Sequence, residues 1–360
     1  MKQYQSYLTK LFIKNILIII IVFVFLSFFL NIFEELKYFE NKKSEIYIPI
    51  FLTILNIPSI IFEVLPFIFL LGVMFFFISL NEKEEIELLK SNGIDNLKIT
   101  SIISVVSLIM GIVLIVLYYS FSANLKSLYL NIKFTYSNTN DHLAIVNENG
   151  LWIKEKDKNN TRIFIINAKN YNINSLENLE ITELDNDYNL INTIVSSKAD
   201  IRDKEWELSE VKIFSNDKKT KFYKLFKYKS SYDEKIISNL YSNLNSLNIL
   251  QLIKLKKNYK LIGYSATDVS LHLNKIYSLP IYLTLTTIIG ALLMFKLTFI
   301  KSKFFLVILG VLVSVIFYYI NYFSILFGKN ETLPVTVSVW LPQILIFLIC
   351  TLGLIRLNES

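Results

Sequence analysis

The chain has 360 residues, of which 53% are hydrophobic and 19% charged, and its mean hydropathy is +0.46. A soluble domain does not need this much apolar surface, so the composition predicts a membrane protein. The net charge of +7 comes from basic residues spread along the chain, which argues against a nucleic-acid partner. The single cysteine, Cys350, excludes an intrachain disulfide and a C-x-x-C metal motif.

Six stretches carry no charged residue, and each is near or above the roughly 20 apolar residues that a helix needs to cross a hydrocarbon core. They are Asn15–Phe33, Val64–Asn81, Ile99–Leu125, Ile276–Phe295, Phe304–Gly328 and Thr332–Ile355. A polar block separates the third from the fourth. We therefore predict a membrane α-helical fold of six transmembrane helices (3+3). Its segments are residues 1–125, an inserted domain at 126–275, and residues 276–360.

The first stretch is too long for the apolar region of a cleaved signal peptide, so we expect a signal anchor. If the N-terminus is inside, ten basic residues fall in short inside segments and four in short outside segments, which fits the positive-inside rule. The ten are Lys2, Lys10, Lys14, Lys83, Lys90, Lys98, Lys296, Lys301, Lys303 and Arg356; the four are Lys37, Lys42, Lys43 and Lys329. In a bacterial inner membrane, both termini are then cytoplasmic and the inserted domain is periplasmic.

Short apolar or alternating runs in the inserted domain are typical of β-strands. They are Leu143–Val146, Leu151–Lys154, Arg162–Lys169, Ile181–Leu184, Leu190–Ser197 and Val211–Phe214. This spacing predicts an antiparallel β-sandwich or jelly roll. A helix at Leu247–Lys257, capped by Ser246, and one at Ser265–Tyr277 that continues into the fourth membrane helix are expected to follow.

The chain carries no phosphate-binding loop, paired carboxylates, activated nucleophile or metal cluster in its sequence. No catalytic, cofactor-binding or metal site is therefore expected, and any energy must come from a partner. His142 and His272 stand far apart and suggest no metal site.

The loop between the second and third apolar stretches predicts a short surface helix over Glu82–Gly93. Asn81 with Glu84 fits a capping box, and Gly93 fits the residue after a helix end. An exposed acidic helix with an apolar stripe is suited to docking another protein. The alternative is a helix that only packs under the bundle. The candidate docking residues are Glu84, Glu85, Ile86, Leu88, Leu89 and Gly93, with Ile86, Leu89 and Gly93 on one face.

Two further groups of charged residues are candidates. Glu63 lies between Pro58 and Pro66 in the second helix and faces either a substrate cavity or the headgroup level. Lys37, Lys42 and Lys43 follow the first helix, where they could contact lipid phosphates or simply be solvated.

The whole chain resembles the LptF/LptG (YjgP/YjgQ) permeases of the lipopolysaccharide-export ABC transporter. The layout of three helices, a β domain and three helices is similar to that family, and local matches occur in the same order. These are Ile57-Pro58 with Glu63–Pro66, Glu85–Ile94, His272–Lys275 with Pro280, and Leu333-Pro334 with Trp340–Pro342. Gly150-Leu-Trp152 followed by a basic strand looks more like the LptG branch.

The resemblance implies an LptF-like second permease, a cytoplasmic LptB-like ATPase dimer that binds the ATP and grips the Glu82–Gly93 helix, and an LptC-like bitopic protein. It also implies that lipopolysaccharide enters between helix one of one permease and helix five of the other, and passes by the periplasmic domain to a bridge toward the outer membrane. Two alternatives remain: a membrane-anchored assembly protein without transport activity, and a transporter of another amphiphile.

Overall fold

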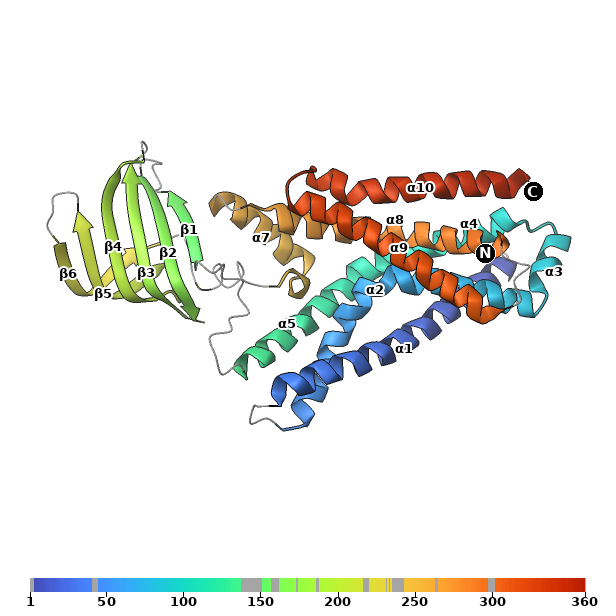
Figure 1. The fold of residues 1–360 in the computed structure, drawn as a ribbon, viewed down its shortest axis with the longest axis horizontal. Helices are drawn as coiled ribbons and strands as arrows, with labels where there is room; N and C mark the ends of the chain where they lie inside the picture. The colour runs from blue at the N-terminus through green and yellow to red at the C-terminus, as the bar shows by residue number, and fades with distance from the viewer. Residues whose placement is uncertain are drawn as a thin grey trace. The chain divides into compact units, whose positions relative to one another are not determined.

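The computed structural model describes residues 3–40, 45–136, 151–156, 162–172, 174–185, 188–215, 220–230, 232, 234, 243–262, 265–296 and 302–359. The chain forms two compact units, shown in Figure 1. One comprises Met1–Tyr136, Asn245–Ile249 and Thr267–Ser360, and contains the long apolar helices. The other comprises Ser137–Leu244 and Leu250–Ala266, and contains a β-sheet.

Six helices are long and apolar enough to cross a membrane, as predicted. The third is built from three consecutive segments that include a π-helix, η1. The helices are α1 (Gln3–Phe39), α2 (Tyr47–Glu82), α4 (Asn96–Val113) with η1 (Leu114–Tyr119) and α5 (Ser120–Thr135), α8 (Thr267–Lys296), α9 (Lys303–Lys329) and α10 (Val335–Glu359). A short helix, α3 (Glu85–Ser91), lies in the loop after α2. Figure 1 shows α3 and both chain termini at the same end of these helices.

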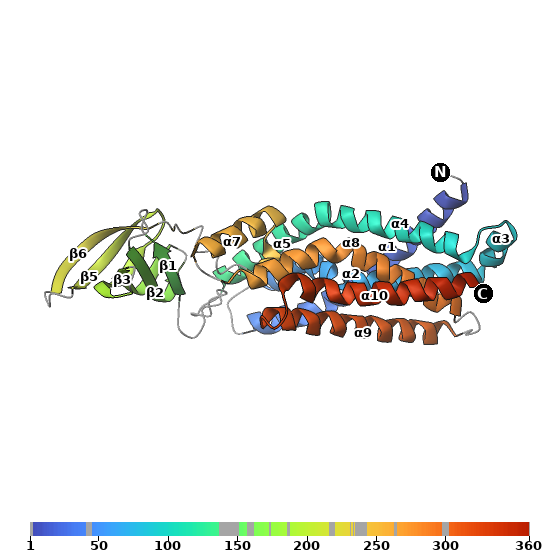
Figure 2. The same cartoon turned by 90° about the horizontal axis from the view of Figure 1, so that it is seen from above.

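Two helices form the centre of the helical unit. In the most apolar segments of α2 and α8, 61% and 67% of the residues are buried, against 22% in α1 and 17% in α9. Figure 2 shows α9 at the margin of the unit. Apolar side chains on α1 and α9 therefore stay uncovered within this chain. Such extensive exposed apolar surface requires lipid or a partner protein to cover it.

A close approach at Gly290 joins the two central helices. A Cβ on Gly290 would lie 2.2 Å from Val73 Cγ1 and 3.2 Å from the Leu70 carbonyl oxygen. We expect Gly290→Ala to destabilise the chain by about 1–3 kcal/mol because the helices must separate. Thermal unfolding of the purified chain in detergent measures this change. Val73→Ala should restore part of the loss, and unchanged melting of the single variant would contradict the close packing.

The second helix contains Pro58 and Pro66, as predicted, and it begins at Tyr47, well before the uncharged stretch Val64–Asn81. The Tyr118 hydroxyl donates a hydrogen bond of 3.1 Å to the Pro58 carbonyl oxygen. Ser246 does not cap a helix, since it lies in a 3₁₀ turn (Leu244–Ser246) and α7 begins after it, at Ile249–Ile262.

The second unit contains six strands in one antiparallel sheet, whose spatial order is the chain order β1 to β6. They are β1 (Leu151–Lys156), β2 (Arg162–Asn172), β3 (Ser175–Asp185), β4 (Leu190–Asp200), β5 (Glu205–Ser215) and β6 (Thr220–Lys229). The predicted antiparallel β domain is confirmed. Its described strands form an up-and-down meander rather than the two-sheet sandwich or Greek-key jelly roll, because every strand pairs with its neighbour in sequence.

Five of the six predicted strand runs lie in observed strands, and the sixth run, Leu143–Val146, lies outside the described residues. The strand missed is β6, whose side chains are mostly exposed. One face of the sheet is covered by a cluster that includes Trp206 and Leu208, both fully buried. The Trp206 indole donates a 2.8 Å hydrogen bond to the Tyr232 carbonyl oxygen, which satisfies its buried N–H.

Candidate functional site

The C-terminal end of α3 is tightly closed. The Gly93 N–H donates to the Lys90 carbonyl at 2.9 Å, and the Ile94 N–H donates to the Leu89 carbonyl at 3.0 Å. These two bonds form a Schellman motif, in which Gly93 adopts φ +73° without a Cβ penalty. The predicted position of Gly93 after the helix end is confirmed, and its backbone is exposed.

The helical path is broken sharply before the N-terminal end of α3. α2 continues to Glu82, and Glu84 adopts φ +56° just before α3 begins. Asn81 therefore lies in the last turn of α2, so the predicted capping box is wrong. A non-glycine residue in the left-handed region costs about 1–2 kcal/mol, so surrounding contacts must hold α3 in this position.

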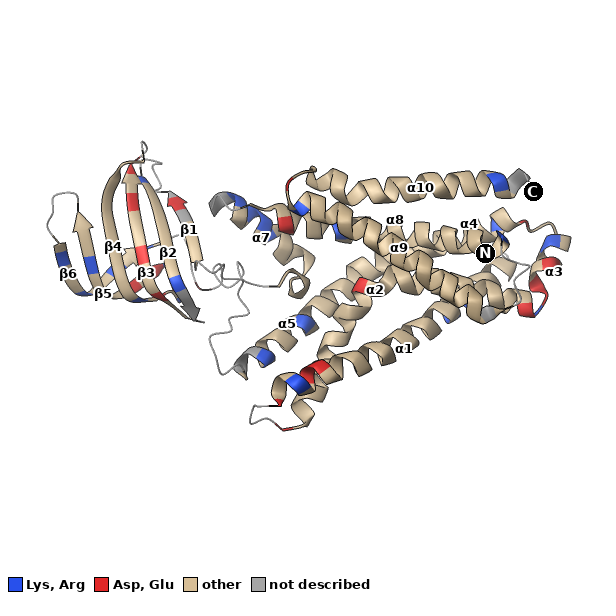
Figure 3. Ribbon diagram, viewed as in Figure 1, with Lys and Arg blue, Asp and Glu red and all other residues tan. Residues whose placement is uncertain are grey.

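The side chains of α3 divide into an inward and an outward set. Ile86 is buried and Leu89 half-buried, and both pack into the core of the helical unit. Leu88 is 60% exposed, and the exposed Glu84 and Glu87 lie on the same short segment. The predicted apolar face is thus largely used within the chain. The surface available to another molecule carries more acidic than basic residues, with Lys90 and one leucine among them, and Figure 3 shows the charged residues gathered at α3 beside long uncharged helices.

Glu85 is held by two neighbours. The Tyr7 hydroxyl, on α1, lies 2.8 Å from Glu85 Oε1 and 2.7 Å from Oε2, and donates to this carboxylate. Lys83 Nζ lies 3.9 Å from Oε1. The Glu85 side chain is 23% exposed, so it is less accessible than an isolated surface glutamate.

A cavity of about 500 Å³ adjoins this helix. Its lining residues come from the first turn of α1, from α3, from the segment that joins α3 to α4, and from the first turn of α4. They are Gln3, Tyr4, Leu89, Asn92, Gly93, Ile94 and Lys98. Lys98 Nζ donates to the Gly93 carbonyl at 2.7 Å and lies 3.7 Å from Asp95, so its charge is already engaged.

The other predicted residues do not converge on one site. Glu63 is exposed on α2 and accepts a 2.7 Å hydrogen bond from the Asn245 amide. Lys37 is exposed in the last turns of α1, while Lys42 and Lys43 lie outside the described residues.

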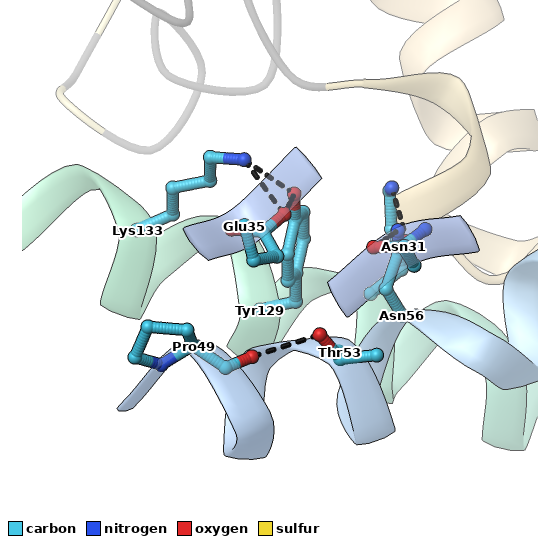
Figure 4. A network of polar contacts seen from close by, with 8 residues as sticks. Asn31, Glu35, Pro49, Thr53, Asn56, Tyr129 and Lys133 are labelled. Atoms are coloured by element: carbon cyan, nitrogen blue, oxygen red, sulfur yellow. Dashed lines mark hydrogen bonds and ion pairs between the residues drawn. The ribbon is translucent and has the colours of Figure 1, made fainter. Parts of the chain in front are cut away.

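A buried charged cluster joins α1 to α5, and the sequence analysis did not find it (Figure 4). Glu35 is fully buried and accepts from the Tyr129 hydroxyl at 2.6 Å and from Lys133 Nζ at 2.8 Å. Lys133 also donates to the Tyr129 oxygen at 2.8 Å and lies 4.4 Å above the Tyr38 ring. Both charges are therefore paired in a region with little water, where breaking the pair is costly.

The polar contacts continue along α1 and α2. Asn56 Nδ2 donates to Asn31 Oδ1 at 3.2 Å, and Lys126 Nζ donates to Asn56 Oδ1 at 2.6 Å. Figure 4 shows Asn31 and Asn56 facing one another near the Glu35 group. These contacts connect α1, α2 and α5 by directional bonds in addition to apolar packing.

The π-helix η1 ends with Tyr118, whose bond to Pro58 is described above, and Tyr119. The Tyr119 hydroxyl lies 3.0 Å from His272 Nε2 on α8 and donates to the Leu247 carbonyl at 3.0 Å. No feature of the sequence indicated this irregularity. His272 is thus engaged by a tyrosine, and the other histidine, His142, lies outside the described residues. Where the structure is described, no group of three or more metal-ligating side chains occurs.

Comparison with known proteins identifies the protein family of this chain. Residues 6–356 match the sequence profile of the lipopolysaccharide export system permease family LptF/LptG. The chain belongs to this family. A search of curated proteins found no match.

Membership in the LptF/LptG family accounts for the architecture as a whole, since the match spans both the apolar helices and the inserted sheet. The chain is a lipopolysaccharide export permease, a multi-pass protein of the inner membrane and a transport subunit. The family also implies that the chain works within a lipopolysaccharide-transporting complex.

Proposed function

We propose that this chain is one permease of an ABC transporter that extracts lipopolysaccharide from the inner membrane and delivers it to a periplasmic bridge toward the outer membrane. The observation that carries the ATPase-driven part is α3. Its inward side chains and Schellman motif hold it firmly, while Leu88, Glu84 and Glu87 remain outside the core. A rigid helix with one exposed leucine among acids is suited to a groove in another protein.

The energy source is an LptB-like ATPase dimer on the cytoplasmic side, because the sequence contains no phosphate-binding loop of its own. The excess of basic residues in the short segments on the α3 side supports a cytoplasmic location of α3 and both termini. The inserted sheet is then periplasmic. We assign the docking role to Glu84, Glu85, Ile86, Leu88, Leu89 and Gly93, in which Leu88 makes the contact and Ile86 and Leu89 anchor α3 from within.

The partner in the membrane is a second permease of the family, LptF-like if this chain is LptG-like. The uncovered apolar residues of α1 and α9 support this pairing, because lipid acyl chains and another permease are both apolar enough to cover them. On α9, Tyr318, Tyr319 and Tyr322 are about half exposed and add hydroxyl groups to this face. Lipopolysaccharide passes between α1 of one permease and α9 of the other.

The lipid leaves by way of the inserted sheet and an LptC-like bitopic protein. β6 is one end of the order of described strands, and a strand added by a partner can extend a sheet at such an end. We keep Lys37, Lys42 and Lys43 as candidate contacts for lipid phosphates and Glu63 as a candidate cavity residue. The LptG-like assignment rests on Gly150–Trp152, of which Leu151 and Trp152 open β1 and Gly150 lies outside the described residues.

The proposal is tested by purifying the tagged chain from its native membrane in a mild detergent and identifying its companions by mass spectrometry. We expect a cytoplasmic ATPase, a second permease of the same layout and bound lipopolysaccharide. Recovery of the chain alone, or with periplasmic proteins only, would instead favour a membrane-anchored assembly protein.

A further inference from the structure

Tyr7 connects α3 directly to α1. Its hydroxyl lies within 2.8 Å of both carboxylate oxygens of Glu85, the first residue of α3. The neighbouring Leu8 and Phe12 are fully buried in the core, so this part of α1 is firmly placed. Hydrogen bonds to an ionised acceptor are stronger than neutral ones, so this bond ties two elements that are 78 residues apart.

The backbone connection between α2 and α3 is poorly suited to transmit a movement of α3 to the other helices. α3 follows α2 through Lys83 and Glu84, and the left-handed Glu84 breaks the helical path. Ile86 and Leu89 hold α3 against the core through apolar packing, which is non-directional and does not align a movement of α3 with α1. The Tyr7–Glu85 bond is directional, and it fixes the position of α3 along α1.

The surroundings leave room for such a movement. The first turn of α1 and the segment after α3 are separated by the cavity of about 500 Å³ that Tyr4 and Leu89 line. On this side the two segments are therefore not closely packed against one another, and the Tyr7–Glu85 bond is a direct polar contact between α1 and α3. α1 is also a helix whose apolar surface stays mostly uncovered within the chain.

We propose that Tyr7 is a positioning residue for transport, whose bond to Glu85 transfers the movement of α3 to the lipid-facing helix α1. The inference rests on the proposed function, in which an ATPase moves α3. In this proposal Tyr7 acts through Glu85. It determines how far the movement of α3 that the ATPase causes is transmitted to α1.

Tyr7→Phe tests this role because it removes only the hydroxyl. The measurement is lipopolysaccharide released per ATP hydrolysed by the purified complex in proteoliposomes, together with the amount of ATPase retained. We expect a roughly ten- to hundredfold lower ratio, the range that loss of a hydrogen bond to a charged group corresponds to, with ATPase retention and ATP turnover within about twofold of wild type. Tyr4→Phe, one turn earlier on the cavity wall, is the matched control and should leave the ratio unchanged.

A double-mutant cycle with Glu85→Gln separates this bond from other effects of the two residues. The glutamine lowers the ratio in the wild-type background and should add little to Tyr7→Phe. Lipid released per ATP hydrolysed does not count ATPase that is lost because Glu85 is also a docking residue. Additive losses, a Tyr7→Phe ratio equal to that of Tyr4→Phe, or a loss of transport that only follows loss of bound ATPase would each overturn the proposal. A wild-type complex that contains no ATPase would instead refute the proposed function.

Discussion

Glu35→Ala is expected to destabilise the helical unit by about 3–5 kcal/mol, the usual cost of leaving one member of a buried ion pair uncompensated. Glu35 is fully buried, and the Lys133 side chain is only 13% exposed. Without the carboxylate, the ammonium group and the Tyr129 hydroxyl lose their shared partner. The loss should appear as a lower midpoint in thermal unfolding of the purified chain in detergent.

Two comparisons show whether the pair causes the loss. Glu34→Ala removes an exposed carboxylate next to Glu35 and should change stability by less than about 0.5 kcal/mol. Replacing both charges, as Glu35→Leu with Lys133→Met, should recover most of the stability because no buried charge is then left unpaired. Wild-type melting of Glu35→Ala would show that the cluster does not hold α1 against α5.

Leu88→Asp is expected to weaken capture of the ATPase by tenfold or more without unfolding the chain. Burial of a leucine side chain contributes about 1.5–3 kcal/mol, and a carboxylate in an apolar groove adds a desolvation cost. Because Leu88 is 60% exposed in the isolated chain, the change removes little internal packing. The measurement is the amount of ATPase that co-purifies with the tagged permease at equal expression.

Asn81→Asp is the matched control for the added charge, since Asn81 is exposed in the last turn of α2, just before α3. It should leave ATPase capture close to wild type. Ile86→Asp is expected to lower expression and melting temperature together, because Ile86 is buried in the core. Equal capture by the Leu88→Asp variant and the wild type would remove Leu88 from the docking surface.

The six membrane helices and the inserted sheet could be predicted because their signals are local. Uncharged stretches of sufficient length define helices, and alternating runs such as Leu190–Ser197 define strands. The order of strands could not be predicted with the same ease. A sandwich and a meander share the same alternation, and the two differ in which strands pair with one another.

The α3 segment shows where sequence reasoning succeeds and where it stops. Gly93 marks the helix end correctly because a left-handed residue after a helix favours glycine. Asn81 misled the prediction, because α2 continues to Glu82 and the break occurs at the non-glycine Glu84. The division between inward Ile86 and outward Leu88 depends on how α3 packs against the core of the helical unit, which the short segment itself does not show.

The buried cluster was missed for a related reason. Glu34, Glu35 and Lys37 follow the uncharged stretch that ends at Phe33, so the sequence suggested a solvated loop. In the structure α1 continues to Phe39, and Glu35 meets Lys133, which lies 98 residues further along the chain. The pattern Tyr129-x-x-x-Lys133, with both residues on one helical face, is the only local signal of a shared partner.

ATP-dependent release of lipopolysaccharide from proteoliposomes tests the central claim most directly. The vesicles contain this permease purified with its companions, and an acceptor protein outside collects the lipid. We expect lipopolysaccharide release to require ATP, to be lost with Leu88→Asp and to persist with Asn81→Asp. Lipopolysaccharide that stays in the vesicles while the intact complex hydrolyses ATP would contradict it.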